Sequence, residues 1–341
     1  MFRIIVPLIV PLAASTVLAQ GTRQAGFFSF QDDACTAFVI NGDAKYAMLG
    51  FNSGGVCVFP IDQMTVHVIS FPAHKKAITG AVFIPESKSM ATASADGAVK
   101  VWKVDDARKH HKTMEDSNGR GKAPAPLATV TIAAHKTGVT GVSLHPGGKR
   151  LASSGLDGAV KIWDVDSGKS VAILADAHAG GTRTVAYSPD GKLLASGGAD
   201  RAVKIWDVQN DKPTLKSTLE GHDGVVTSVA FDPKGVRIAA GCGVLKKSGA
   251  IFIWDVATAK YAFKLTGPDD IVTCVLFHPT TPHLASGGAD KKIRFWSLTD
   301  QKQLSADEHG ETISSLNISF DGLRFGSSSA HTARWWRGFS N

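Results

Sequence analysis

The 341-residue sequence predicts an all-β fold built from seven four-stranded units. Three observations predict it. A strand-like block with a tryptophan recurs at nearly constant spacing, glycine is abundant at 35 residues, and apolar and polar residues alternate within each block. The spacing is 43 residues from Trp163 to Trp206, 48 from Trp206 to Trp254 and 42 from Trp254 to Trp296. This is the period of one blade in a β-propeller, so a single ring-shaped domain is expected over 20–341.

The repeated blocks follow one another to the end of the chain. The clear copies are 99–104, 160–165, 203–208, 251–256 and 292–298, with weaker copies at 56–61 and 334–336. Only five residues follow Trp336, so the last blade lacks a fourth strand of its own. Residues 27–30 precede the first blade and are correctly placed to supply that strand. We expect this N-terminal strand to close the ring, because closure removes an exposed strand edge.

Four residue types also recur around each clear copy: a His before the first strand, a Ser or Thr in the second, an Asp in the next turn, and the Trp. They are His74, Thr92, Asp96 and Trp102 in blade two, His135, Ser153, Asp157 and Trp163 in blade three, and His178, Ser196, Asp200 and Trp206 in blade four. This pattern resembles the WD-repeat family, and the resemblance covers essentially everything after the first 19 residues. It implies a hydrogen-bonded chain that ends at the indole N–H, and a propeller whose loops bind protein partners.

A His, a Ser and an Asp in one repeat also suggest a hydrolytic triad. A catalytic set is needed once and not in every blade, so a structural network that gives the buried indole a partner is preferred. Blade five has Ala240 in place of the Ser and no matching Asp, blade six has no His, and blade seven has His331 where the Asp is expected. The sequence therefore predicts neither an enzyme nor a cofactor or metal site.

The N-terminus differs in composition from the rest of the chain. A positive start at Arg3 precedes an almost wholly apolar run over 4–18, and small or apolar residues precede Gln20. This layout predicts a secretory signal peptide over 1–19, and hence a periplasmic or secreted protein with no membrane span after cleavage. An uncleaved anchor stays open as the alternative, although the run is shorter than the ~20 residues that span a bilayer.

The four cysteines lie among small or apolar residues at positions where other blades have Thr, Ser, Lys or Gly. Two of them, Cys35 and Cys57, are expected on the first and third strands of one blade, with a strand between them. Free, mostly buried thiols are therefore predicted, and no disulfide framework.

An insertion separates the second and third tryptophan blocks. Trp102 and Trp163 are 61 residues apart, which places a polar loop at about 105–126 on the face opposite the His-bearing turns. His110 and His111 lie in it, but adjacent histidines in a loop are a weak metal signal, and a solvated loop is preferred.

Five basic residues are expected on the His-bearing face of blades four to six. Arg183 falls in a column of innermost-strand positions that is otherwise small and polar, namely Cys35, Thr79, Thr140, Thr227, Thr273 and Ser314. Arg201 and Lys291 follow the turn Asp, and Lys246 and Lys247 lie in an enlarged turn of blade five. Together they predict a basic arc. Scattered surface charge is the alternative, because the net charge is +7 and Asp223, Asp269 and Asp270 are nearby.

These features predict an exported, non-catalytic interaction platform that binds a protein or an acidic peptide on this face and is a monomer on its own. Nucleic acid is not expected as a partner, because no aromatic residues interleave the arc for base stacking. Two alternatives stay open: an accessory subunit of a membrane or redox complex, and a small-ligand binder or enzyme at the channel mouth.

Overall fold

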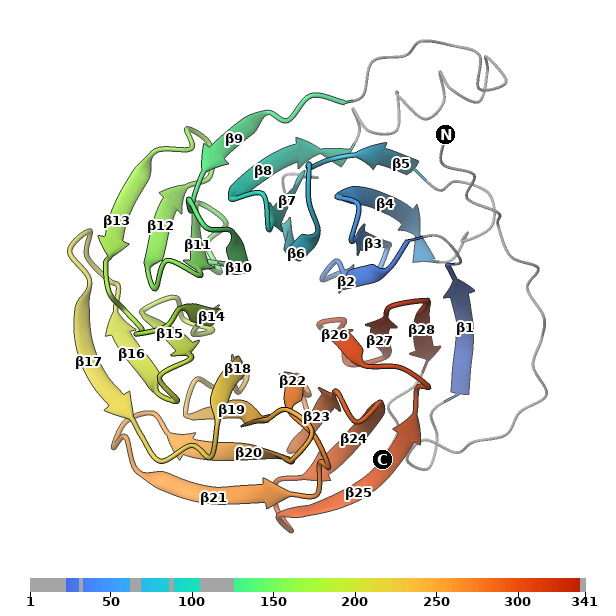
Figure 1. Ribbon diagram of the computed structural model, residues 1–341, viewed down its shortest axis with the longest axis vertical. Coiled ribbons are helices and arrows are strands. Elements are labelled where there is room, and N and C mark those ends of the chain that lie inside the picture. Colours follow the sequence, from blue (N-terminus) through green and yellow to red (C-terminus); the bar gives the residue numbers. More distant parts are fainter. Residues whose placement is uncertain (1–22, 31–32, 62–68, 86–88, 105–125, 338–341) are drawn as a thin grey trace.

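Seven four-stranded sheets stand around a central opening in the computed structural model (Figure 1). The structure describes residues 23–30, 33–61, 69–85, 89–104 and 126–337. Within each sheet, neighbouring strands are antiparallel and the innermost strand comes first in the chain, except in the last blade. The predicted seven-bladed β-propeller is confirmed. Within these described ranges, no helix has the length and hydropathy needed to cross a membrane.

The strands, in blade order, have the following bounds. Blades one and two consist of β2 (Cys35–Ile40), β3 (Tyr46–Phe51), β4 (Gly55–Pro60) and β5 (Ile69–Pro72), then β6 (Ile78–Ile84), β7 (Ser89–Ser94), β8 (Ala98–Lys103) and β9 (Val130–Ala133). Blades three and four consist of β10 (Val139–Leu144), β11 (Arg150–Gly155), β12 (Val160–Asp164) and β13 (Ser170–Leu174), then β14 (Thr182–Tyr187), β15 (Leu193–Gly198), β16 (Val203–Asp207) and β17 (Thr214–Leu219). Blades five and six consist of β18 (Val225–Phe231), β19 (Arg237–Val244), β20 (Ser248–Asp255) and β21 (Tyr261–Thr266), then β22 (Val272–Phe277), β23 (His283–Gly288), β24 (Lys292–Ser297) and β25 (Lys302–Glu308). Blade seven consists of β26 (Ile313–Ile318), β27 (Arg324–Ser329), β28 (Thr332–Arg337) and β1 (Arg23–Ser29).

The two ends of the chain close the ring. β1 pairs antiparallel with β28, with Gly26 opposite Trp335 and Ser29 opposite Thr332. β1 is thus the outermost strand of the last blade, beside the red strands of the C-terminus in Figure 1. The predicted closure by an N-terminal strand is confirmed, and it gives β28 a partner on both sides.

The hydrophobic core lies between neighbouring blades. For example, Val160 and Ile162 on β12 pack in one cluster with Leu194 and Trp206 of blade four. Another cluster joins Ala333 of blade seven to blade one, where the ring closes. Because each strand alternates its side chains between two faces, every blade contributes to the interface before it and the interface after it.

The first strand of every blade carries a β-bulge against the second strand. The pairing skips one residue in each of the seven blades, as it skips Thr140 between Val139 and Gly141. The skipped residues are Thr36, Thr79, Thr140, Arg183, Thr227, Thr273 and Ser314. The predicted column was therefore wrong at blade one, where Thr36 and not Cys35 is the matching residue. Bulges re-aim side chains, and here they make one position per blade distinct at the channel.

All four cysteines are free. Burial raises the pKa of the Cys57 and Cys242 thiols to about 11, so neither is a reactive thiolate at neutral pH. The predicted signal peptide at 1–19 lies outside the described residues, and so does the predicted insertion at 105–126 apart from its last residue.

Candidate functional site at the channel mouth

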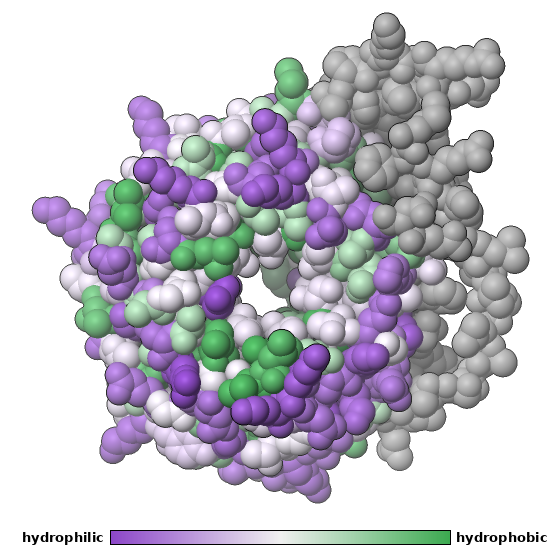
Figure 2. Space-filling model, viewed as in Figure 1, coloured by the Kyte–Doolittle hydropathy of each residue, from purple (hydrophilic) through white to green (hydrophobic). Residues whose placement is uncertain are grey.

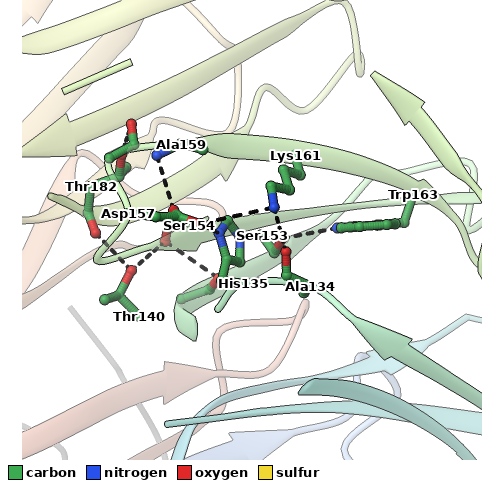
Figure 3. Close-up of polar contacts among 12 residues, drawn as sticks. Ala134, His135, Thr140, Ser153, Ser154, Asp157, Ala159, Lys161, Trp163 and Thr182 are labelled. Atoms are coloured by element: carbon green, nitrogen blue, oxygen red, sulfur yellow. Dashed lines mark hydrogen bonds and ion pairs between the residues drawn. The ribbon is translucent and has the colours of Figure 1, made fainter. Parts of the chain in front are cut away.

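Blade three shows the recurring polar side chains in full (Figure 3). His135 Nδ1 lies 2.9 Å from an Asp157 oxygen, and His135 Nε2 lies 2.8 Å from Ser153 Oγ. The indole N–H of Trp163 donates to the same Ser153 Oγ at 2.9 Å. A carboxylate only accepts, so Nδ1 carries the imidazole proton and Nε2 accepts from the Ser153 hydroxyl. Ser153 Oγ then donates one bond and accepts another, and the chain of bonds runs from the Asp157 turn to the buried indole.

Blades two and four repeat this arrangement. The His–Ser/Thr and Trp–Ser/Thr distances are 2.9 and 2.9 Å in blade two and 2.8 and 2.9 Å in blade four. The side chains of His74, His135 and His178 are fully buried, and burial lowers the pKa of each imidazole, against the opposing effect of its Asp. Neutral imidazoles therefore fill these positions at neutral pH. The structural role assigned to the twelve residues stays a prediction until variants are measured.

In blade five, the histidine bonds directly to the tryptophan, with no hydroxyl residue between them. With Ala240 in place of the hydroxyl residue, the Trp254 indole donates directly to His222 Nε2 at 3.2 Å. His222 Nδ1 donates to the carbonyl of Arg201, in the turn of the preceding blade, at 3.0 Å. Phe252 packs against the imidazole, with ring centroids 4.9 Å apart. The histidine thus satisfies the indole without an acid.

Blade six replaces the missing histidine with an ion pair. Arg294 Nη1 lies 2.6 Å from Asp290 Oδ2, and the two side chains are only 4% and 5% exposed. Arg294 Nη2 donates to the carbonyl of Gly267, much as Lys161 of blade three donates to Ala134. The Trp296 indole still donates to Ser286, at 2.9 Å. Sequence reasoning missed this pair, although an arginine at the strand position of a lysine was a visible signal.

Blade seven keeps the histidine, but a hydroxyl takes the place of its acid. His309 Nε2 lies 2.9 Å from Ser327 Oγ, while Nδ1 faces the Thr332 hydroxyl at 3.3 Å. His331, which has the expected spacing of the Asp, lies 2.5 Å from Glu311 instead. Burial and the charge of Arg334 lower the pKa of His309 to about 4.

The bulged residues of the innermost strands form hydroxyl links between blades. Thr140 Oγ1 donates to the carbonyl of Thr182 in the next blade at 2.8 Å. The corresponding donors in blades five, six and seven also reach the following blade, and they are Thr227 to Val272, Thr273 to Ile313, and Ser314 to Cys35. Arg183 occupies the same bulge in blade four and has no hydroxyl to make this link. Blade packing therefore does not require an arginine at this position.

Arg183 lines a cavity of about 350 Å³ at the channel mouth. The other lining residues come from blades two, three and five, and they are Thr79, Ala95, Thr137, Gly138, Val139, Thr140, Leu156 and Thr227. Arg183 is half-buried and is the only charged residue among them. The cavity therefore presents one positive charge in a wall of small and apolar groups.

Arg201 and Lys291 lie exposed in the turns between the second and third strands of their blades. Each has a positive φ, 63° and 68°, at the turn position where blades two and three have Gly97 and Gly158. Lys246, with φ 59°, and the exposed Lys247 are in the longer turn between β19 and β20 on the same face. Non-glycine residues at positive φ are uncommon and raise the question of function.

Two of the three acids that were expected to dilute the arc pair with other lysines, and the third bonds to the backbone of the arc itself. Asp223 pairs with Lys264, and Asp269 pairs with Lys292 at 3.4 Å. Asp270 Oδ1 accepts from the backbone N–H groups of Lys246 and Ile271. Across the described part of the chain, no carboxylate forms an ion pair with the five predicted cations Arg183, Arg201, Lys246, Lys247 and Lys291. The structure thus places these cations on one face, four in turns of blades four, five and six and one on an inner strand.

Apolar and further basic side chains lie on the same face. Figure 2 shows apolar surface beside the central opening, over the blades of β18 to β22, bordered by hydrophilic side chains. Leu245, next to Lys246, is 62% exposed, and Leu156 in the corresponding turn of blade three is 44% exposed. Sequence reasoning also missed the exposed Lys76 and Lys136, which follow the recurring histidines and extend the basic surface over blades two and three.

Comparison with known proteins places these features in a family. A family model described as "WD domain, G-beta repeat" matches more than half of the chain, over residues 65–103, 126–164, 168–207, 213–255 and 259–297. The chain is 29% identical over 295 residues to nuclear distribution protein nudF 1 of Talaromyces marneffei, covering 72% of this chain and 64% of that protein.

Two further relatives show the same limited coverage. The ribosome biogenesis protein WDR12 homolog of Trichoplax adhaerens is 26% identical over 234 residues, covering 65% of this chain and 52% of that protein. Pre-mRNA-processing factor 19 homolog 2 of Arabidopsis thaliana is 28% identical over 244 residues, covering 71% and 42%. The chain therefore spans less than two thirds of the length of these relatives.

The names of these relatives contradict the predicted location. Nuclear distribution, ribosome biogenesis and pre-mRNA processing are processes inside the cell, so the predicted periplasmic or secreted location is wrong. That prediction depended on the hydropathy of residues 1–19 alone, and no folded feature of the propeller supported it. The repeat matches and the seven closed blades lead to one conclusion: this chain belongs to the WD-repeat family of β-propellers.

Proposed function

We propose that this propeller is a non-catalytic interaction platform that binds an acidic peptide or protein segment on its His-bearing face. WD-repeat propellers act as protein-interaction scaffolds. The observation that carries the acidic preference is Arg183, a charged residue at a bulge where the other blades have hydroxyls. The turn cations Arg201, Lys246, Lys247 and Lys291 add positive charge around it.

Electrostatic and apolar features support the same partner. None of the five cationic side chains pairs with an acid among the described residues, whereas Asp223 and Asp269 are paired with other lysines. Complementary charge speeds association and selects partners more than it adds affinity. The exposed Leu245 and Leu156 supply apolar contacts beside the charge. An acidic segment with interspersed apolar residues therefore fits this face best.

Burial argues against hydrolysis by the His, Ser and Asp sets. Ser153 is fully buried, and its oxygen already bonds to both His135 and Trp163. A nucleophile must reach its substrate, and a fully buried hydroxyl that is hydrogen-bonded to two side chains does not. The repetition of the set in three blades points the same way. We therefore assign these residues to the support of the blades.

The test is a selection of random displayed peptides on the immobilised propeller. Peptides rich in Asp and Glu are expected to be enriched. A variant with Arg183→Glu, Arg201→Glu and Lys291→Glu should bind the selected peptide about tenfold more weakly, mainly through slower association, and the difference should shrink at high salt.

The matched control makes the same charge change on the opposite face. Lys149, Lys169 and Lys234 are exposed and lie in turns at the other ends of the strands. A Lys149→Glu, Lys169→Glu, Lys234→Glu variant should bind the peptide as the wild type does. Equal weakening in both variants would show a nonspecific effect of net charge, and enrichment of neutral or basic peptides would contradict the proposal.

A further inference from the structure

Two hydrogen-bond donors at the channel-mouth cavity are unused within the described residues. Thr79 Oγ1 is buried and has no hydrogen-bond partner there, although Thr79 lines the cavity. The Arg183 guanidinium, on the same cavity, pairs with no carboxylate or carbonyl of the described chain. By contrast, the hydroxyls of Thr140 and Thr227 donate to backbone carbonyls of the following blades. The lining of the cavity thus includes an unpaired guanidinium and a buried hydroxyl without a partner, and no acid.

The cavity has room for one side chain and its flanking atoms. Its volume of about 350 Å³ is at the small end of ligand pockets, which hold roughly 300–1,000 Å³. The rest of the wall includes Leu156, Val139 and Ala95, which offer no competing charge. A planar guanidinium donates two parallel N–H bonds, and a carboxylate accepts them in the matching geometry.

We propose that this cavity binds one carboxylate, that of a Glu or Asp side chain in the acidic segment. The inference rests on the proposed function and names its anchor. Arg183 donates two N–H bonds to the carboxylate, and the Thr79 hydroxyl donates a third. The cations of the turns, which are exposed, attract the segment at longer range, whereas the half-buried Arg183 selects one residue of it.

One substitution separates this role from support of the fold. Thr at position 183 matches the bulge residues of the neighbouring blades, and its hydroxyl is expected to reach the carbonyl of Val226, as Thr140 reaches Thr182. Arg183→Thr should therefore melt at the wild-type temperature or higher. It should also lose at least about tenfold in affinity for the selected acidic peptide.

The decisive experiment is a double-mutant cycle with that peptide. Each Glu of the peptide is changed to Gln, one at a time. The affinity of each peptide is then measured for the wild-type propeller, for Arg183→Lys and Thr79→Val, and for the control variant Lys291→Gln. Changing one particular Glu to Gln should weaken binding of the peptide about tenfold, more than changing any other Glu. Combining that change with Arg183→Lys should weaken binding no further. Thr79→Val should weaken binding about threefold at the same position. Lys291→Gln should weaken all peptides alike.

Other outcomes would overturn the anchor. Additive losses at every Glu position, or wild-type affinity in Arg183→Lys, would leave acidic docking intact and show that no single carboxylate enters the cavity. Failure of every acidic peptide to bind would instead contradict the proposed function.

Free glutarate, compared with neutral glutaramide, distinguishes the source of the carboxylate. Glutarate should displace the peptide, and tight glutarate binding without any peptide binding would show a small-molecule site and overturn the peptide anchor.

Discussion

Arg294 and Asp290 form a nearly inaccessible ion pair, 2.6 Å apart, in the one blade of blades two to seven that lacks the recurring histidine. The pair links the third strand to the turn before it, and Arg294 also reaches Gly267 in the connection from the preceding blade. Like the histidine of blade three, the pair ties the turn to the connection from the preceding blade, but it does so from the third strand and makes no bond to the second. Each of these buried charges needs the other, because water cannot reach either group to compensate for a lost partner.

Removal of one partner is therefore expected to be costly. Arg294→Leu should lower the free energy of unfolding by about 3–5 kcal/mol, since Asp290 would remain buried without a counter-charge. The double variant Arg294→Leu, Asp290→Leu should recover much of that loss. Urea unfolding followed by tryptophan fluorescence measures both. A loss below ~1 kcal/mol in the single variant would show that the pair is open to water.

In the network of blade four, removal of a large buried side chain should lower the stability more than removal of a small polar one. Trp206→Ala should cost about 3–5 kcal/mol, as large-to-small core changes do. Asp200→Ala should cost about 1–3 kcal/mol, because it leaves the His178 donor without its acceptor. Thermal and urea unfolding test both values. Wild-type stability in the two variants would refute the structural role and reopen the question of chemistry.

Ring closure should depend on β1. Deletion of residues 26–30 removes most of the strand that pairs with β28 and leaves an unpaired edge on the last blade. A lower melting temperature and aggregation on heating are expected. The control replaces the same five residues with Ala, which keeps the backbone pairing. If the deleted chain melts like the wild type, another segment must cover β28.

Stability should fall as the pH drops below about 6.5. The folded state lowers the pKa of His74, His135, His178 and His222 by burial, and lowers the pKa of His309 to about 4. Above 6.5 the imidazoles are neutral in both states. Between 6.5 and the folded pKa only the unfolded chain takes up protons, which costs up to about 1.4 kcal/mol per pH unit for each histidine.

Melting temperatures between pH 8 and pH 4 measure this effect. The raised pKa of Asp307, also a result of burial, acts in the opposite direction near the acid end of the range. His309→Gln should melt with a shallower pH dependence than the wild type, because one of the titrating groups is gone. A flat profile from pH 7 to pH 5 in the wild type would show that the imidazoles are accessible and protonated in the fold.

The cations in the turns should lower the stability of the fold. Arg201→Gly and Lys291→Gly each place glycine at a positive φ, as Gly97 already is in blade two. Each change should stabilise the fold by about 1 kcal/mol through relief of backbone strain. The same variants should bind acidic peptides more weakly. Reduced stability would mean that the side chains themselves support the turns.

The sequence by itself determined the blades, because their evidence is local. Alternation within a strand and the recurrence of Trp163, Trp206 and Trp254 need no tertiary contact to be seen. Ring closure followed from counting strands, since the last blade ended one strand short. The same local evidence misled at the N-terminus, where hydropathy over 1–19 suggested a location that the relatives contradict.

Only the tertiary structure decided which polar groups are used and which are free. The bulge register moved the column of blade one from Cys35 to Thr36, since pairing across strands has no signature within a single strand. The pairing of Arg294 with Asp290 depends on a side chain that folds back onto a turn. Arg183 and Thr79 line one cavity only because the blades curve around one channel, which brings residues 104 positions apart in the chain to the same opening.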